Sequence, residues 1–344
     1  MSIGFLMTGH VQKIKDLVET AQRLTKESGY EITVGEEWLG IQLCPTGELQ
    51  VSWEKDAEKS GQWIVTVDCQ TTPAGAGFHK AALELAEKLG IEEPKVDDET
   101  DYYSHRDFMR MKQEHFYPYM RTMIKFCKEK LDKGSSHICL SWNMDWYSPE
   151  NVCQTVVTPM GRFKIETLNA LLEQQDIETL AQRFFLWENE KRDALFYRNR
   201  AIHKLWVECY FVPSSCSKKD KAMNKSILED LERAYQMNPK LPFPYEAYQE
   251  LCKLDNKKPT IQERGTEPLF DFPVGYRKGL ITEKLGKLRL TLPGSYQYEW
   301  EEYDNGGGTN LWCDASIGSP VWRVSGFRAR SGGGKFFRRR GRIK

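Results

Sequence analysis

The chain has 344 residues, about twice the ~150 of a typical domain, and it contains no apolar run near the ~20 residues that a membrane-spanning helix needs. Hydrophobic residues make up 40% and charged residues 28%, which excludes a disordered chain. The formal net charge is 0, but residues 1–100 carry nine basic against 18 acidic groups, whereas residues 328–344 carry eight basic and no acidic groups. We therefore expect an acidic first domain that attracts basic partners, a basic tail, and no association with a membrane.

The nine cysteines form no C-x-x-C pair, so their spacing predicts neither a zinc ribbon nor a redox motif. Residues 1–10 lack the basic start and the long apolar stretch of an export signal. We therefore expect a cytoplasmic protein with reduced thiols, no bound metal and no cofactor.

Residues 1–100 are predicted to form one acidic domain. Apolar residues at three- and four-residue steps indicate helices over 11–28 and 78–89, ended by Gly29 and Gly90. Between them, 38–43, 48–53 and 63–69 have the aromatic and β-branched content of strands. The predicted order is α-β-β-β-α, which favours an antiparallel sheet with both helices packed on one face.

Residues 101–258 are predicted to form a mainly helical domain. An acidic connection over 91–101 leads to a long helical pattern over 105–131, which Pro118 should kink or split. Strands are predicted over 137–142 and 152–157, and helices over 163–211, 225–237 and 245–254.

Residues 259–327 are predicted to hold a proline-bearing linker and a small antiparallel β unit. The strands are expected over 285–292, 296–303, 311–314 and 321–327, with a glycine-rich turn over 304–310. Residues 328–344 show no apolar period and are predicted to form a flexible basic tail. The fold class is therefore α+β: an N-terminal α-β-β-β-α sandwich, a central mainly helical region and a small C-terminal antiparallel β unit.

The turn Thr72-Pro73-Ala74-Gly75-Ala76-Gly77-Phe78-His79 is the strongest local motif. Gly75 and Gly77 permit a close backbone approach, and the start of the following helix could bind a phosphate through its free N–H groups. The third glycine of a dinucleotide fingerprint is replaced by Lys80. The alternative interpretation is a turn that lets the helix pack tightly on the sheet.

An acidic run with a histidine follows that turn, formed by Asp98, Glu99, Asp101 and His105. Together with His79 these side chains offer oxygen and nitrogen ligands, but their spacing matches neither a His-Glu-x-x-His motif nor an EF-hand loop. The alternative is that the carboxylates are solvated or cap the helix that begins near Ser104.

Two further groups of residues suggest partner binding. Trp142, Trp146 and Tyr147 form an aromatic cluster that could contact a protein partner or pack beneath a loop. Arg338, Arg339, Arg340 and Arg342 lie in the basic tail and could bind a polyanion such as nucleic acid without sequence preference.

Several blocks resemble a family of uncharacterised bacterial proteins. They are residues 72–79, 98–102 with Arg106-Asp107-Phe108, Ala234-Tyr235 with 239–242, and Leu292-Pro293-Gly294-Ser295 with Glu299-Trp300. The likeness extends to about Phe327 and implies a bacterial, cytoplasmic origin, but no activity. In addition, Ile227, Leu231, Ala234 and Pro239 have the spacing of the second helix of a tetratricopeptide repeat, without a second copy at a 34-residue period.

These observations favour a noncatalytic bacterial protein that binds a protein partner. A toxin-immunity or defence setting would suit such a protein, because an acidic surface complements a basic toxin. One alternative is a metal- or phosphate-dependent enzyme centred on residues 72–79 and 97–107. Another is nucleic-acid binding through the tail.

Overall fold

The computed structural model describes residues 2–59, 61–135, 137–140, 153–207, 215, 218–262, 271, 280–285, 288–293, 296–303, 308–314 and 321–324. The chain divides into two compact units, residues 1–294 and 295–344. An antiparallel N-terminal sheet, a mainly helical middle and small antiparallel C-terminal sheets confirm the predicted α+β class. In the described part of the chain, no helix has the length and apolar character needed to cross a membrane.

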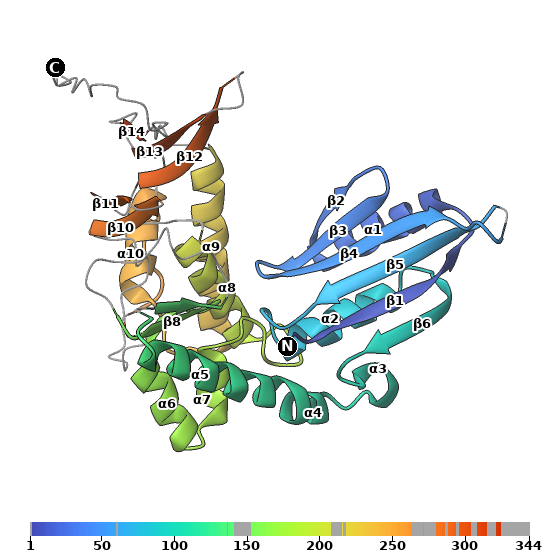
Figure 1. Ribbon diagram of the computed structural model, residues 1–344, viewed down its shortest axis with the longest axis horizontal. Helices are drawn as coiled ribbons and strands as arrows, with labels where there is room; N and C mark the ends of the chain where they lie inside the picture. Colours follow the sequence, from blue (N-terminus) through green and yellow to red (C-terminus); the bar gives the residue numbers. More distant parts are fainter. Residues whose placement is uncertain are drawn as a thin grey trace, which may run out of the picture. The chain divides into compact units, whose positions relative to one another are not determined.

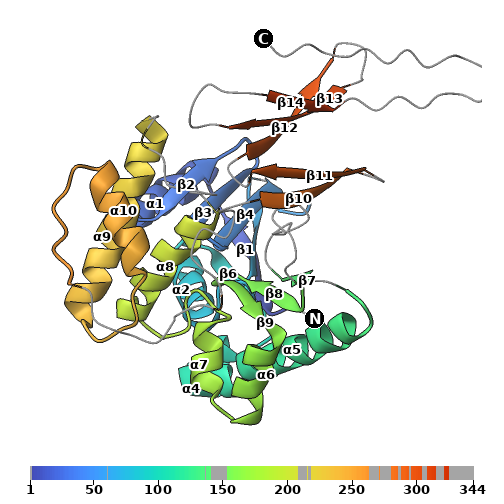
Figure 2. The same cartoon turned by 90° about the vertical axis from the view of Figure 1, so that its left-hand side faces the viewer.

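The first part of the larger unit is a six-stranded antiparallel sheet with the order β2-β3-β4-β5-β1-β6. Its elements are β1 (Gly4–Val11), α1 (Ile14–Ser28), β2 (Glu31–Val34), β3 (Trp38–Cys44), β4 (Gly47–Lys55), β5 (Trp63–Gln70), α2 (Ala76–Glu87) and β6 (Glu92–Asp98). Both helices lie on the same face of this sheet (Figures 1 and 2). They cover a core built from alternate strand residues such as Phe5, Leu49 and Val67.

The predicted order α-β-β-β-α therefore omits three strands, β1, β2 and β6. The pattern over 11–28 begins too early, because Val11 is the last residue of β1 and the helix starts at Ile14. The expected connection over 91–101 contains β6, which pairs with β1 in the register Phe5 to Asp98. The sheet is thus twice as wide as predicted, with β1 between β5 and β6.

The long helical pattern over 105–131 is divided into several pieces, and one of the divisions lies just before Pro118. The pieces are α3 (Tyr102–His105), α4 (Phe108–Met111), a π-helical turn η1 (Lys112–Phe116) and α5 (Tyr117–Asp132). Pro118 lies in the first turn of α5, which directly follows the π-helical turn. Phe116 and Tyr117 keep right-handed helical angles, so the chain passes from one helical element to the next without a break.

A three-stranded sheet and five helices complete most of the larger unit. They are β7 (His137–Cys139), β8 (Thr155–Thr158), β9 (Gly161–Lys164), α6 (Ile165–Glu173), α7 (Ile177–Gln182), α8 (Ala194–Val207), α9 (Lys218–Met237) and α10 (Tyr245–Leu254). The pattern over 163–211 is thus not one helical run, since it begins in β9 and is interrupted after α7. One hydrophobic core extends from Ile3 to Ala234, and a second cluster joins α8, α9 and α10.

The C-terminal strands are short and antiparallel, but the single strand predicted over 285–292 falls on two strands, since Leu285 ends one and Leu288 begins the next. A two-stranded sheet, β10 (Leu280–Leu285) and β11 (Leu288–Pro293), belongs to the larger unit, and β12 (Tyr296–Glu302), β13 (Gly308–Asp314) and β14 (Val321–Val324) form a three-stranded sheet in the smaller one. The predicted turn over 304–310 lies mostly outside the described residues.

Candidate functional site

Gly75 and Gly77 do permit a close backbone approach, and the approaching segment belongs to the chain itself. The N–H group of Gly77 donates to the carbonyl oxygen of Trp187 at 3.0 Å, and the N–H group of Trp187 donates to that of Ala74 at 2.7 Å. A Cβ atom on Gly75, which has a φ of 110°, would lie 2.7 Å from the Trp187 carbonyl oxygen. One of the first N–H groups of α2 is therefore already hydrogen-bonded to a residue that lies more than 100 positions later in the chain.

His79 and Asp98 are brought together by the fold in a buried polar network. The Nε2 atom of His79 lies 3.1 Å from Oδ1 of Asp98, and its Nδ1 atom lies 2.9 Å from the hydroxyl of Thr71. The Thr100 hydroxyl, 3.2 Å from Nε2 of His79, donates to Oδ1 of Asp98 at 2.8 Å. The His79 side chain is completely inaccessible to solvent, with Phe5, Tyr102 and Phe116 packed edge-on around its ring.

The electrostatics of this pair favour a charged Asp98. Burial alone would raise the pKa of Asp98, but the hydrogen bond and the charge of His79 outweigh it. The backbone N–H groups of Tyr103 and Thr100 also donate to the carboxylate, and together these contacts hold the pKa of Asp98 well below its usual range. The contact between His79 and Asp98 joins α2 to the end of β6. No solvent reaches His79, so this contact is part of the buried interior.

The other predicted members of this site lie elsewhere. Glu99 accepts a hydrogen bond from the backbone N–H of Gly4 at 2.8 Å, whereas Asp101 and His105 are exposed at the two ends of α3. Arg106 forms an ion pair with Glu87. Within the residues that the structure describes, no three His, Cys, Asp or Glu side chains converge in a way that could hold a metal ion.

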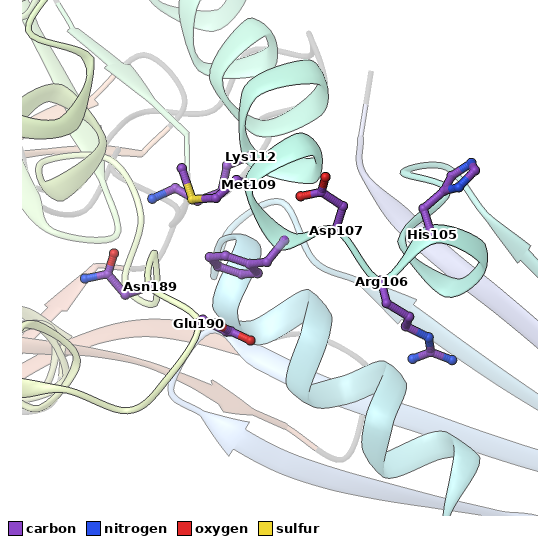
Figure 3. Close-up of a pocket in the computed structure, with 8 residues that line it drawn as sticks. His105, Arg106, Asp107, Met109, Lys112, Asn189 and Glu190 are labelled. Carbon is purple, nitrogen blue, oxygen red and sulfur yellow. The ribbon is translucent and has the colours of Figure 1, made fainter.

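His105 borders a surface depression of about 560 Å³ that is lined by residues 105–109, Lys112, Asn189 and Glu190. In Figure 3, His105 and Arg106 point away from Asn189, while Lys112 and Met109 lie on its side of the helix. The predicted histidine is therefore at the rim of this depression, not at its centre.

Beneath the depression lies a buried ion pair that the sequence did not reveal. The ammonium of Lys112, in the π-helical turn, is 2.8 Å from Oε1 of Glu188, which also accepts a hydrogen bond from the Tyr117 hydroxyl at 3.0 Å. Burial raises the pKa of Glu188, while the charge of Lys112 opposes that rise. The two opposite charges compensate each other in the interior. The ion pair also joins the π-helical turn to the 187–190 segment, which Gly75 and Gly77 contact.

The face of the six-stranded sheet opposite α1 and α2 is exposed and acidic. The strand registers arrange the outward side chains of this face in rows, because residues opposite each other on paired strands share a face. One row contains Gln50, Asp68, Leu6 and Asp97, in strand order. We use the name acidic face for this surface. Its outward carboxylates are Glu31, Glu48, Glu54, Asp68, Glu92 and Asp97, and its exposed apolar residues are Leu6 and Trp38.

The charge of the acidic face is poorly compensated. Lys95 is the one lysine or arginine facing this side among the described strand residues. Glu54, Asp68 and Asp97 form no ion pair within the described part of the chain. Asp68 and Asp97 lie two strands apart, at about 10 Å. This separation is slightly greater than the ~8 Å screening length at physiological salt, so salt weakens the repulsion between the two carboxylates.

Sequence reasoning predicted an acidic first domain but did not place its carboxylates on one face of the sheet, although a signal for that face was present. Residues 47–55 alternate buried Leu49, Val51 and Trp53 with the polar residues between them, which indicates one solvated face. The predicted aromatic cluster at Trp142, Trp146 and Tyr147 and the arginines at 338–342 lie outside the described residues.

Comparisons with known proteins do not supply a function. No family model matches the chain, and no curated protein or solved structure shows significant similarity to it. The enzyme centred on residues 72–79 and 97–107 and the resemblance to a bacterial family stay predictions.

Proposed function

We propose that this chain is a noncatalytic binding protein that holds a basic protein partner on the acidic face. The observation that carries the proposal is the contrast between six outward carboxylates and one outward lysine, Lys95, among the described strand residues of a solvent-exposed sheet. A cationic surface placed over these carboxylates would pair with them and would be steered toward them before contact.

The size of the face supports a protein partner. Six strands about 4.8 Å apart and about seven residues long give a projected area of roughly 550 Å². A stable interface buries about 800 Å² on each partner, so the sheet provides most of one side of such an interface. Leu6, with 41% of its surface exposed, lies between Asp68 and Asp97 and offers an apolar contact among the charges.

A basic toxin neutralised by this chain would be one partner of this kind, and the chain would then act as an immunity protein. The same acidic face would also suit a regulator of another basic protein. What we propose about the partner is therefore that its contacting surface is basic.

The proposal is tested by affinity capture from the host with two double variants. Asp68→Lys with Asp97→Lys reverses two charges of the acidic face, while Glu129→Lys with Glu246→Lys makes the same change at exposed positions on α5 and α10. The captured protein is identified by mass spectrometry and purified, and its affinity is measured by calorimetry at 50 and 300 mM salt.

We expect a partner with a basic surface whose affinity falls at least tenfold with the first pair of substitutions and less than twofold with the second. Affinity should also fall as the salt concentration rises. Equal binding by wild type and the Asp68/Asp97 variant would overturn the proposal. Nuclease treatment and deletion of residues 328–344 identify partners held by nucleic acid or by the tail instead.

A further inference from the structure

Trp38 is an exposed indole at the start of β3, on the acidic face. Its exposed fraction is 46%, and it lies opposite Ser52 of β4. The tight turn before it is closed by a hydrogen bond of 2.8 Å from the N–H of Gly35 to the carbonyl oxygen of Trp38. A Cβ atom on Gly35 would overlap the indole Nε1 atom, so the glycine allows the ring to lie back over the turn.

A second glycine brings a carboxylate beside the same ring. A Cβ atom on Gly40 would overlap Oε1 of Glu48 and would lie 3.5 Å from the Cζ3 atom of Trp38. The carboxylate and the indole edge thus occupy the space that a side chain at position 40 would fill. The Oε2 atom of Glu48 accepts from the amide of Gln50 at 3.4 Å, and no cationic side chain pairs with Glu48 among the described residues.

An aromatic face and an adjacent carboxylate are the two groups that together bind an organic cation. The π-system of indole attracts a cation placed over it, and the carboxylate accepts its N–H groups. A guanidinium suits both contacts better than an ammonium, because it is planar, stacks on aromatic rings and is more weakly hydrated.

We infer that Trp38 and Glu48 form a receptor for an arginine side chain of the partner. The inference rests on the proposed function and adds to it the chemistry of one contact: the partner's guanidinium stacks on the indole of Trp38 and donates to Oε1 of Glu48. Asp68 and Asp97 then provide the longer-range attraction, while this pair provides the specific contact.

The test uses the full chain and three defined peptides, namely six repeats of Arg-Gly, of Lys-Gly and of Glu-Gly. The indole N–H signal of Trp38 is assigned by its loss in Trp38→Phe and is followed by two-dimensional NMR during each titration. We expect the Arg-Gly peptide to shift this signal, the Lys-Gly peptide to bind more weakly, and the Glu-Gly peptide to leave it unchanged.

Variants then measure the contribution of each group, and their affinity for the Arg-Gly peptide is measured by calorimetry because the Trp38 variants lack the indole signal. Trp38→Ala and Glu48→Gln should each weaken binding of the Arg-Gly peptide about fivefold, whereas Trp300→Ala, at another exposed tryptophan, and Glu129→Gln should change it less than twofold. Trp38→Phe keeps an aromatic face and should lose less than Trp38→Ala, which separates the cation contact from any effect on folding.

The outcomes distinguish the two proposals. If the Asp68/Asp97 charge reversal abolishes binding of the native partner but Trp38→Ala and Glu48→Gln do not alter it, the arginine receptor is overturned and the proposed function stands. If the peptide responds to Trp38 and Glu48 while the native partner ignores the charge reversal, the proposed function fails. An unmoved Trp38 signal at saturating Arg-Gly peptide overturns the receptor directly.

Discussion

The backbone N–H of Gly77 donates to the carbonyl oxygen of Trp187, and this 3.0 Å hydrogen bond joins the start of α2 to a segment 110 residues later. The contact explains the glycine-rich turn without a bound ligand. It also predicts that the smallest possible side chain at position 77 is costly.

Gly77→Ala should destabilise the larger unit by about 3 kcal/mol, because the new methyl group would overlap the carbonyl oxygen of Asn189 and the indole of Trp187. Urea unfolding measures the loss. Gly134→Ala is the control, since its Cβ atom would meet nothing within 4 Å and only its φ of 102° is unfavourable, at about 1 kcal/mol. Equal losses in both variants would contradict the packing explanation.

Asp98→Asn should cost about 3 kcal/mol at pH 7, because it leaves buried His79 without its carboxylate partner. The folded pKa of Asp98 is lowered, so its contribution is present above the unfolded pKa of about 3.9 and is lost as pH falls below it. The difference in unfolding free energy between variant and wild type should therefore shrink in acid. Asp97→Asn, at the neighbouring outward position, should change stability by less than about 0.5 kcal/mol at either pH.

His203 of α8 should make the protein less stable in mild acid. Burial lowers the pKa of His203 to about 4, helped by the charge of Lys204, although its Nδ1 atom donates to the Pro159 carbonyl oxygen at 2.7 Å. The unfolded chain takes up this proton near pH 6.5, so the contribution of the neutral ring is complete above that pH and is lost as pH falls toward 4.

Between pH 7.5 and 5.5 this group alone should lower the free energy of unfolding by about 1 kcal/mol. His203→Gln removes the titrating group. Thermal unfolding scans at the two pH values should therefore show a smaller decrease in stability for the variant than for the wild type. The same fall in both proteins would show that His203 is protonated in the folded state.

Lys112→Met should be more damaging at high pH than at low pH. Without Lys112, the already raised pKa of Glu188 rises further, and a raised carboxyl pKa costs stability as pH increases above the unfolded value near 4.3. Urea unfolding at pH 5 and pH 8 should show the larger loss at pH 8. Adding Glu188→Gln should recover much of that loss, and Lys125→Met, on the exposed side of α5, should show no such pH dependence.

The sequence by itself determined the local elements whose side chains repeat with a clear period. Leu17, Ala21 and Leu24 specify α1, and Leu49, Val51 and Trp53 specify β4, because burial of one face imposes a period of 3.6 or 2 residues. It missed β1, where Leu6 and two glycines obscure the alternation, and β6, where six of the seven residues Glu92–Asp98 are polar or proline and pairing with β1 makes the strand.

The sequence also determined that residues 1–100 are acidic, since the net charge of a segment depends only on the residues that it contains. Only the tertiary structure decided how the candidate residues are used. It separated His79 and Asp98, which are buried together, from exposed Asp101 and His105, and it assigned the glycines to a contact with Trp187. The pairing register gathered distant carboxylates such as Asp68 and Asp97 on one face, because residues far apart in sequence become neighbours only when strands hydrogen-bond.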